Sequence, residues 1–208
     1  MNITVIGASA GVGLEAVHVA LARGHRVTTL SRSIDALPVG ENLTAVQGTA
    51  TSVADVRQAT VDADAVLVTL GTKKLGATTL FSDTASALVE AMAGRKEPMI
   101  VVTGFGTGDS AQFQNPVART FMKALLGRMY ADKSRMEDIL TATSLQWEIV
   151  RPGTLSNTST VGTTTGITSF HKGMKVPRIS RKNLAAFLVD EAEERRYPRQ
   201  IVLPTVHP

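Results

Sequence analysis

A glycine-rich turn directly after the first apolar run constrains this chain more than any other feature. The run at residues 3–6 leads into Gly-Ala-Ser-Ala-Gly-Val-Gly at residues 7–13, after which apolar residues continue at helical spacing. Glycine is needed where a pyrophosphate approaches the backbone N–H groups at a helix start, because side chains would hold its oxygens away. A tight turn without a ligand would also suit glycine. The predicted dinucleotide contacts are Gly7, Ser9, Ala10, Gly11, Val12 and Gly13.

The rest of the chain alternates between short apolar runs and amphipathic stretches. This alternation predicts βαβ units and a mostly parallel sheet with helices on both faces. A length of 208 residues suits one packed core. We therefore expect an α/β, Rossmann-type, doubly wound fold in a single domain over residues 1–208, with its ligand at the carboxyl ends of the strands. The expected strands are 2–6, 26–30, 43–47, 64–70, 99–103, 145–150 and 200–203, and the expected helices are 12–23, 52–61, 79–93, 116–142 (with a break near Gly127) and 180–194.

The segment 153–177 departs from this alternation, being rich in Gly, Ser and Thr. We interpret it as a long connection or a lid on the substrate side, because a long loop in a compact domain usually has a function. Flexibility alone would give the same composition. The segment carries His171, a candidate proton donor that could equally be a solvated loop histidine.

The end of the second expected strand selects between two cofactors. Enzymes that use NAD place an acidic residue there for the ribose 2′-hydroxyl. Here the chain has Ser31, Arg32 and Ser33 instead. An arginine can pair with a 2′-phosphate, and a neighbouring serine can add a hydroxyl. The sequence therefore favours NADP(H), although an isolated arginine in a loop could simply be solvated.

Composition excludes several classes of function. The chain has no cysteine, which excludes disulfides and thiolate sites, and its four histidines show no metal-ligand spacing, so we expect no metal. No apolar run approaches the length of about 18 residues that spans a bilayer, and the N-terminus resembles a strand more than a signal peptide, so we expect a cytoplasmic protein and no membrane partner. The net charge of +4 favours an anionic partner. Because the basic residues are scattered and aromatic residues make up only 4%, we expect no nucleic-acid binding.

Further motifs lie at residues 64–66 and 70–72, at 101–103, and at 147–153, which read Trp-Glu-Ile-Val-Arg-Pro-Gly. With the glycine turn and Arg32, they make the chain resemble the atypical short-chain dehydrogenase/reductases, in particular the small NAD(P)-binding group that includes biliverdin-IXβ reductase/flavin reductase. The resemblance covers nearly the whole chain. It implies that Leu70, Gly71 and Thr72 lie near the dinucleotide, that Thr103 and Gly104 border the nicotinamide, and that Pro152 and Gly153 close the nicotinamide side.

Three departures from the family pattern bear on the chemistry. Thr49 stands where the family often has an aspartate beside the adenine, and Thr103 places a hydroxyl one position before the usual serine. Classical members use a Tyr-x-x-x-Lys pair, but Tyr130 precedes Lys133 by only three residues and is rotated by about 100° on a helix, with Met129 at the classical position. We expect the classical proton relay to be absent. Lys133 resembles the lysine that atypical members keep, and could reach the nicotinamide ribose or form a surface ion pair with Glu137.

These observations predict an NADPH-dependent reductase that transfers hydride to an acceptor needing little proton assistance, such as a flavin, a quinone or a tetrapyrrole. The candidate catalytic residues are Thr103, Lys133 and His171. The expected partner is a small-molecule acceptor, and the protein would be a monomer or a homodimer. The alternative is an NADP(H)-binding sensor or scaffold without turnover, because fold does not settle function. The expected acceptor wall comprises Phe105, Leu155, Phe170 and Met174.

Overall fold

The computed structural model describes residues 1–72, 77–113, 116–158 and 162–207. Strands and helices alternate along most of this length, as predicted. The strands are β1 (Asn2–Ile6), β2 (Arg26–Ser31), β3 (Leu43–Gln47), β4 (Ala65–Val68), β5 (Met99–Val102), β6 (Trp147–Val150), β7 (Leu155–Ser156), β8 (Thr163–Ile167), β9 (Ile179–Ser180) and β10 (Ile201–His207). The helices are α1 (Gly11–Ala22), α2 (Val53–Thr60), α3 (Leu80–Ala91), the 3-10 helix η1 (Gly108–Phe113), α4 (Pro116–Thr141) and α5 (Arg181–Glu194).

Eight strands form one twisted sheet in the order β3-β2-β1-β4-β5-β6-β10-β8. All neighbours pair in parallel except β10 and β8, which pair antiparallel. The first six strands follow the order of a doubly wound dinucleotide-binding fold, in which the chain reverses direction across the sheet between β1 and β4. This order confirms the predicted Rossmann-type architecture in a single domain. Sheets of this kind bind their ligands at the carboxyl ends of the strands.

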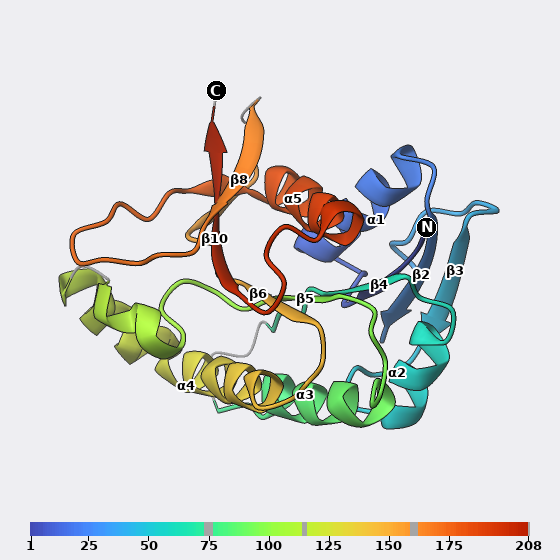
Figure 1. Cartoon of the computed structure of the whole chain (residues 1–208), viewed down its shortest axis with the longest axis horizontal. Coiled ribbons are helices and arrows are strands. Elements are labelled where there is room, and N and C mark those ends of the chain that lie inside the picture. Colours follow the sequence, from blue (N-terminus) through green and yellow to red (C-terminus); the bar gives the residue numbers. More distant parts are fainter. Residues whose placement is uncertain (73–76, 114–115, 159–161, 208) are drawn as a thin grey trace.

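Two helical layers cover the sheet (Figure 1): α1 and α5 lie on one face, and α2, α3 and α4 lie on the other. Successive residues of β1 point into opposite layers, because side chains alternate along a strand. Ile3 and Val5 belong to the core under α1 and α5, whereas Ile6 belongs to the core under α2, α3 and α4. All three are fully buried, and each contributes roughly 1.5–3 kcal/mol by burial. The two cores fix β1, and with it the turn that follows.

The prediction that residues 153–177 form one irregular connection was wrong in part. The segment contains β7 and β8, and β8 pairs with β10 in the register Gly166 to Pro204. Its strand, Thr163-Thr164-Thr165-Gly166-Ile167, is mostly β-branched, which suits a pleated surface. Residues 168–178 do form an irregular connection. The expected break near Gly127 was also wrong, because α4 is continuous over 26 residues.

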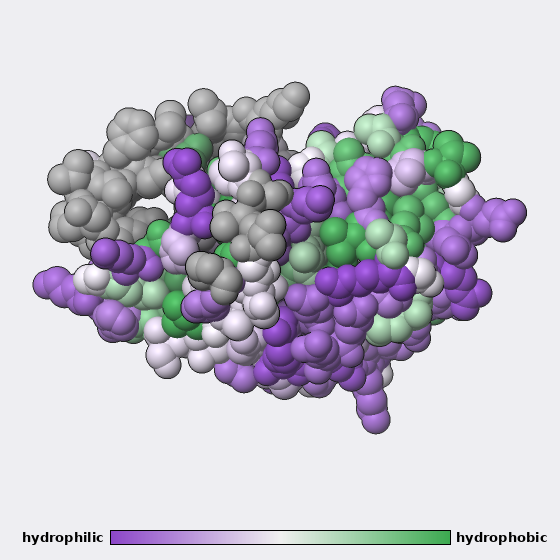
Figure 2. All heavy atoms as spheres, turned by 90° about the horizontal axis from the view of Figure 1, so that it is seen from above, coloured by the Kyte–Doolittle hydropathy of each residue, from purple (hydrophilic) through white to green (hydrophobic). Residues whose placement is uncertain are grey.

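The surface mixes polar and apolar residues. Hydrophilic side chains cover much of the face seen in Figure 2, with smaller hydrophobic areas between them. The most exposed large hydrophobic residues, Val39 and Val61, belong to separate segments. In the ranges that the structure describes, no helix combines the length and the apolar character needed to cross a membrane.

Candidate functional site

A cavity of about 1500 Å³ opens at the carboxyl ends of the six parallel strands β1 to β6. The segments that follow these six strands all contribute to its wall. Single-ligand sites usually measure roughly 300–1,000 Å³, so this cavity has room for a dinucleotide and a second small molecule. The predicted site residues that line it are Gly7, Ser9, Ala10, Gly11, Val12, Ser31, Arg32, Leu70, Gly71, Thr72, Thr103, Gly104, Lys133, Pro152 and Gly153.

The glycine turn brings the backbone close to the cavity. Gly7 and Gly11 have φ angles of +87° and +58°, in the left-handed region that favours glycine. A Cβ at Gly7 would lie 3.0 Å from the carbonyl oxygen of Thr69, and one at Gly13 would collide with the carbonyl oxygen of Gly7. Ala10 caps α1 without a side-chain hydrogen bond. The first N–H groups of this helix therefore have no side-chain acceptor from their cap, which suits a phosphate ligand.

Three of the predicted cofactor-binding and catalytic residues do not line the cavity. Gly13 lies beneath the turn, where its role is close packing. The Ser33 hydroxyl donates to the Asp35 carboxylate at 3.0 Å. His171 is exposed, and its Nδ1 lies 3.2 Å from the carbonyl oxygen of Lys172. The structure therefore does not bring His171 to the other candidate catalytic residues.

The cavity wall next to β2 is polar and basic. Ser31 is buried, and its hydroxyl has no hydrogen-bond partner in the part of the chain that the structure describes. Arg32 follows it and is exposed at the rim. Thr49, which replaces the family's aspartate, also lines the cavity. An unpartnered buried hydroxyl beside an exposed arginine fits a phosphorylated ribose, because both groups can donate hydrogen bonds to phosphate oxygens.

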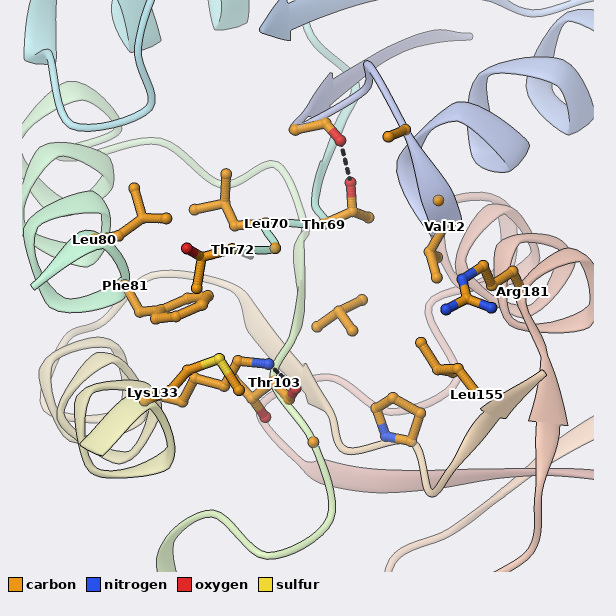
Figure 3. A pocket seen from close by; sticks show the side chains of 18 of the residues that line it. Val12, Thr69, Leu70, Thr72, Leu80, Phe81, Thr103, Lys133, Leu155 and Arg181 are labelled. Atoms are coloured by element: carbon orange, nitrogen blue, oxygen red, sulfur yellow. Dashed lines mark hydrogen bonds between the residues drawn. The ribbon is translucent and has the colours of Figure 1, made fainter. Parts of the chain in front are cut away.

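Lys133 reaches the opposite part of the cavity from α4. Its ammonium donates to the carbonyl oxygen of Thr103 at 2.6 Å and lies 5.0 Å from the centre of the Phe81 ring (Figure 3). Burial lowers the pKa of Lys133 to about 8, while the charge of Glu137 acts in the other direction. Glu137 is itself engaged by other groups, so the alternative of a surface ion pair between Lys133 and Glu137 does not describe this lysine.

Glu137 is the centre of a buried polar network that sequence reasoning missed. Arg151 forms two hydrogen bonds with it, at 2.8 and 3.1 Å, and the hydroxyls of Thr103 and Thr107 donate to the same carboxylate at 2.5 and 2.6 Å. Arg151 also pairs with Asp109 at 2.6 Å. The Thr103 hydroxyl thus donates to Glu137, whereas its carbonyl oxygen accepts from Lys133. The sequence offered two separate signals, Arg151 in the Arg-Pro-Gly motif and Glu137 one helical turn after Lys133, and neither suggested the other as a partner.

Tyr130 also borders the cavity, although it stands one position after the classical tyrosine. A Cβ at Gly104 would lie 3.1 Å from its hydroxyl oxygen. Burial raises the pKa of Tyr130, whereas a proton-transferring tyrosine needs a pKa closer to the working pH. Met129, at the classical position, lines the cavity as well.

An apolar wall adjoins the ends of β5 and β6. Phe105, Leu155 and Met174 line the cavity as expected, together with Phe113. Phe170 packs behind this wall, with ring centres 5.7 Å from Phe105 in an edge-to-face arrangement. Planar conjugated molecules bind well against such aromatic surfaces.

Arg181, at the start of α5, lines the cavity and was not predicted. The sequence did show a basic residue at the beginning of an expected helix. It gave no indication that the connection 153–177 brings this helix start beside the glycine turn.

Known proteins resemble this chain in sequence and in fold. A family model described as NAD(P)H-binding matches residues 7–195, whereas no curated protein matches the sequence. Among solved structures, an anaerobillin reductase from Escherichia coli O157:H7 has 22% identity and a TM-score of 0.77, with 100% of both chains covered.

Two further solved structures share the fold. A short-chain dehydrogenase/reductase from Veillonella parvula in complex with NADP has 17% identity and a TM-score of 0.80, covering 100% of this chain and 94% of that one. A candidate NADH-flavin reductase from Streptococcus pneumoniae has 21% identity and a TM-score of 0.81, with 100% of both chains covered. The family match and the glycine-turn cavity lead to one conclusion: the chain belongs to the NAD(P)H-binding family whose model covers residues 7–195.

Proposed function

We propose that this protein is an NADPH-dependent reductase that transfers hydride to a small conjugated acceptor such as a flavin, a quinone or a tetrapyrrole. One observation carries the proposal. A single cavity joins the glycine turn to an apolar aromatic wall, and Thr103 and Gly104 lie on the same lining. A dinucleotide held at the turn and an acceptor held at the wall would share this space.

The choice of NADPH over NADH rests on charge. The described residues that line the cavity include Arg32, Lys133 and Arg181 but no aspartate or glutamate. An enzyme selective for NAD would place a carboxylate near the ribose 2′-hydroxyl. A basic residue and the buried Ser31 hydroxyl occupy that region instead, and both can bind a 2′-phosphate.

In this proposal, the bound cofactor supplies the hydride and the protein supplies position. The turn holds the pyrophosphate, and Lys133 holds the nicotinamide ribose while its ammonium is fixed by the Thr103 carbonyl. The Glu137 network fixes Thr103, and the apolar wall orients the acceptor and keeps water away. Solvent or the Lys133 ammonium delivers the proton that completes the reduction.

The acceptor class is supported by the apolar wall and by the kinds of protein that share the fold. Two structural neighbours are named as an anaerobillin reductase and a candidate NADH-flavin reductase. We extend this chemistry to the present chain as part of the proposal. Phe105 and Phe113 would stack on or against a planar ring system.

The alternative, an NADP(H)-binding sensor or scaffold, is favoured by one observation. Thr103 directs its hydroxyl to Glu137, and the pKa of Tyr130 is raised by burial, so neither is prepared to donate a proton. NADPH oxidation with FMN, riboflavin, a quinone and a linear tetrapyrrole separates the two functions. The reductase proposal predicts turnover with at least one acceptor, and NADPH binding without any turnover would favour the sensor.

A further inference from the structure

Arg181 reaches the cavity from α5, on the side opposite Lys133 (Figure 3). Its guanidinium extends toward Val12 in the first turn of α1, and Leu155 lies nearby. A Cβ at Gly11 would lie 3.9 Å from the Arg181 Nε. The arginine is thus close to the helix start where the glycine turn would hold a phosphate.

The charge of Arg181 is not neutralised by a carboxylate in the described ranges, where no ion pair to it is found. Its hydrogen-bond partner is neutral: Nη1 donates to the Asn157 amide oxygen at 2.6 Å. The first turn of α1 has no acidic residue and no side-chain cap. Two sources of positive potential, the arginine and the helix N-terminus, therefore face the same part of the cavity.

We propose that Arg181 binds the pyrophosphate of the dinucleotide from the start of α5, beside the glycine turn. This inference rests on the proposed function. The fork of a guanidinium matches the spacing of phosphate oxygens and can form two parallel hydrogen bonds with them. Arg32 would then recognise the 2′-phosphate and Arg181 the pyrophosphate, so the two arginines have separable roles.

Asn157 acts as a positioning residue in this arrangement. It follows β7, whose residue Leu155 belongs to the acceptor wall, and β7 pairs with β9 directly before Arg181. The hydrogen bond between Asn157 and Arg181 thus connects the acceptor side of the cavity to the pyrophosphate side. Removing the amide should leave the charge of Arg181 in place but allow more side-chain conformations, and so weaken binding less than removing the arginine.

The test is calorimetric titration of the full chain with NADPH and with NADH. We expect Arg181→Met to weaken both cofactors by a similar factor of about 10 to 100, since both contain the pyrophosphate and charge-assisted hydrogen bonds to it are lost. Arg181→Lys should retain part of the affinity for both cofactors. If Arg181→Met does not fold, titration of Arg181→Lys with NADPH and NADH tests the role of Arg181 instead. The matched control is Lys182→Met, which removes the same charge from the next, exposed residue and should change either affinity by less than about twofold.

The outcomes separate this inference from the proposed function. If the unmodified protein binds neither cofactor, the proposed function fails. If it binds NADPH and Arg181→Met binds equally well, only the role of Arg181 is overturned. Arg181 would also be misassigned if the variant keeps its NADPH affinity but shows a raised KM for FMN and an unchanged KM for riboflavin, because the arginine would then bind the phosphate of the acceptor.

Discussion

Arg151 and Glu137 form a buried two-point ion pair, with Nε and Nη2 of the arginine 3.1 and 2.8 Å from the two carboxylate oxygens. The pair joins the residue after β6 to the C-terminal part of α4, and both side chains are at most 3% exposed. Because the hydroxyls of Thr103 and Thr107 donate to the same carboxylate, the pair also fixes the loop after β5. The wall of the cavity near the expected nicotinamide thus depends on a charge pair outside it.

Glu137→Gln should lower the free energy of unfolding by about 3 kcal/mol, toward the lower end of the range for breaking a buried pair. The Arg151 charge would remain buried with only the largely exposed Asp109 as a partner. Denaturant unfolding of the variant and of Asp138→Asn, an exposed neighbour on the same helix, provides the comparison. A loss below about 1 kcal/mol would show that the pair adds little to stability.

Lys133 should make the affinity for NADPH depend on pH near pH 8. Its pKa is lowered to about 8, so its ammonium loses its proton as the pH rises through that value. If the charged form binds the cofactor, NADPH affinity should fall across this pH range in the unmodified protein, and Lys133→Met should bind weakly at every pH without this inflection. Persistence of the same inflection in the methionine variant would assign it to another group.

Tyr130→Phe should change kcat/KM for any accepted flavin by less than about threefold, because the pKa of this phenol is raised and its position is not the classical one. The substitution keeps the ring that lies 5.7 Å from the Lys133 ammonium. Steady-state kinetics with NADPH and riboflavin test this directly. A loss of about a hundredfold would make Tyr130 the proton donor in spite of its shifted position.

Arg32→Asp should weaken NADPH binding by at least about tenfold more than NADH binding, since the new carboxylate repels a 2′-phosphate. Arg57→Asp, an exposed substitution on α2 outside the cavity, controls for the change in net charge. Calorimetric titration of each variant with NADPH and with NADH measures how far the two affinities fall. Equal losses for NADPH and NADH would refute the assignment of Arg32 to the 2′-phosphate.

Glu148 should make the folded state less stable as the pH rises. Burial and the neighbouring Glu191 raise the pKa of Glu148 to about 9, while Arg196 forms its ion pair with Glu191. Because the folded protein retains this proton above the ordinary glutamate pKa of 4.5, unfolding releases it, and stability declines between about pH 4.5 and 9. Glu148→Gln should weaken that decline and stabilise the protein at pH 8 by on the order of 1–3 kcal/mol, whereas exposed Glu41→Gln should not. An unchanged pH profile in Glu148→Gln would contradict this account.

Much of the fold could be predicted from the sequence because its strands are local apolar runs. β4 is buried on both sides and reads Ala-Val-Leu-Val, and the buried part of β1 reads Ile-Thr-Val-Ile, so both appear as short, mainly apolar runs. β8 was missed because it is an edge strand of threonines with Gly166, a composition shared with loops. Gly166 is required there by packing, since a Cβ would collide with the Val202 side chain, and no local pattern reveals such a contact.

The site was predictable where the residues follow strand ends. The glycine turn, Arg32 and Thr103 come directly after the parallel strands β1, β2 and β5, and the topology brings them together. Arg151 and Arg181 could not be placed, because their roles depend on the path of the chain after β6 and on partners far away in the sequence. His171 was expected at the cavity on chemical grounds alone, and the structure leaves it exposed.

Titration of the purified protein with NADPH by calorimetry tests the central claim most directly. The account predicts saturable binding to one site per chain, tighter than NADH binding, because the cavity offers the glycine turn and three basic side chains to an anionic dinucleotide. No binding of either cofactor would contradict it, and tighter binding of NADH would overturn the choice of NADPH.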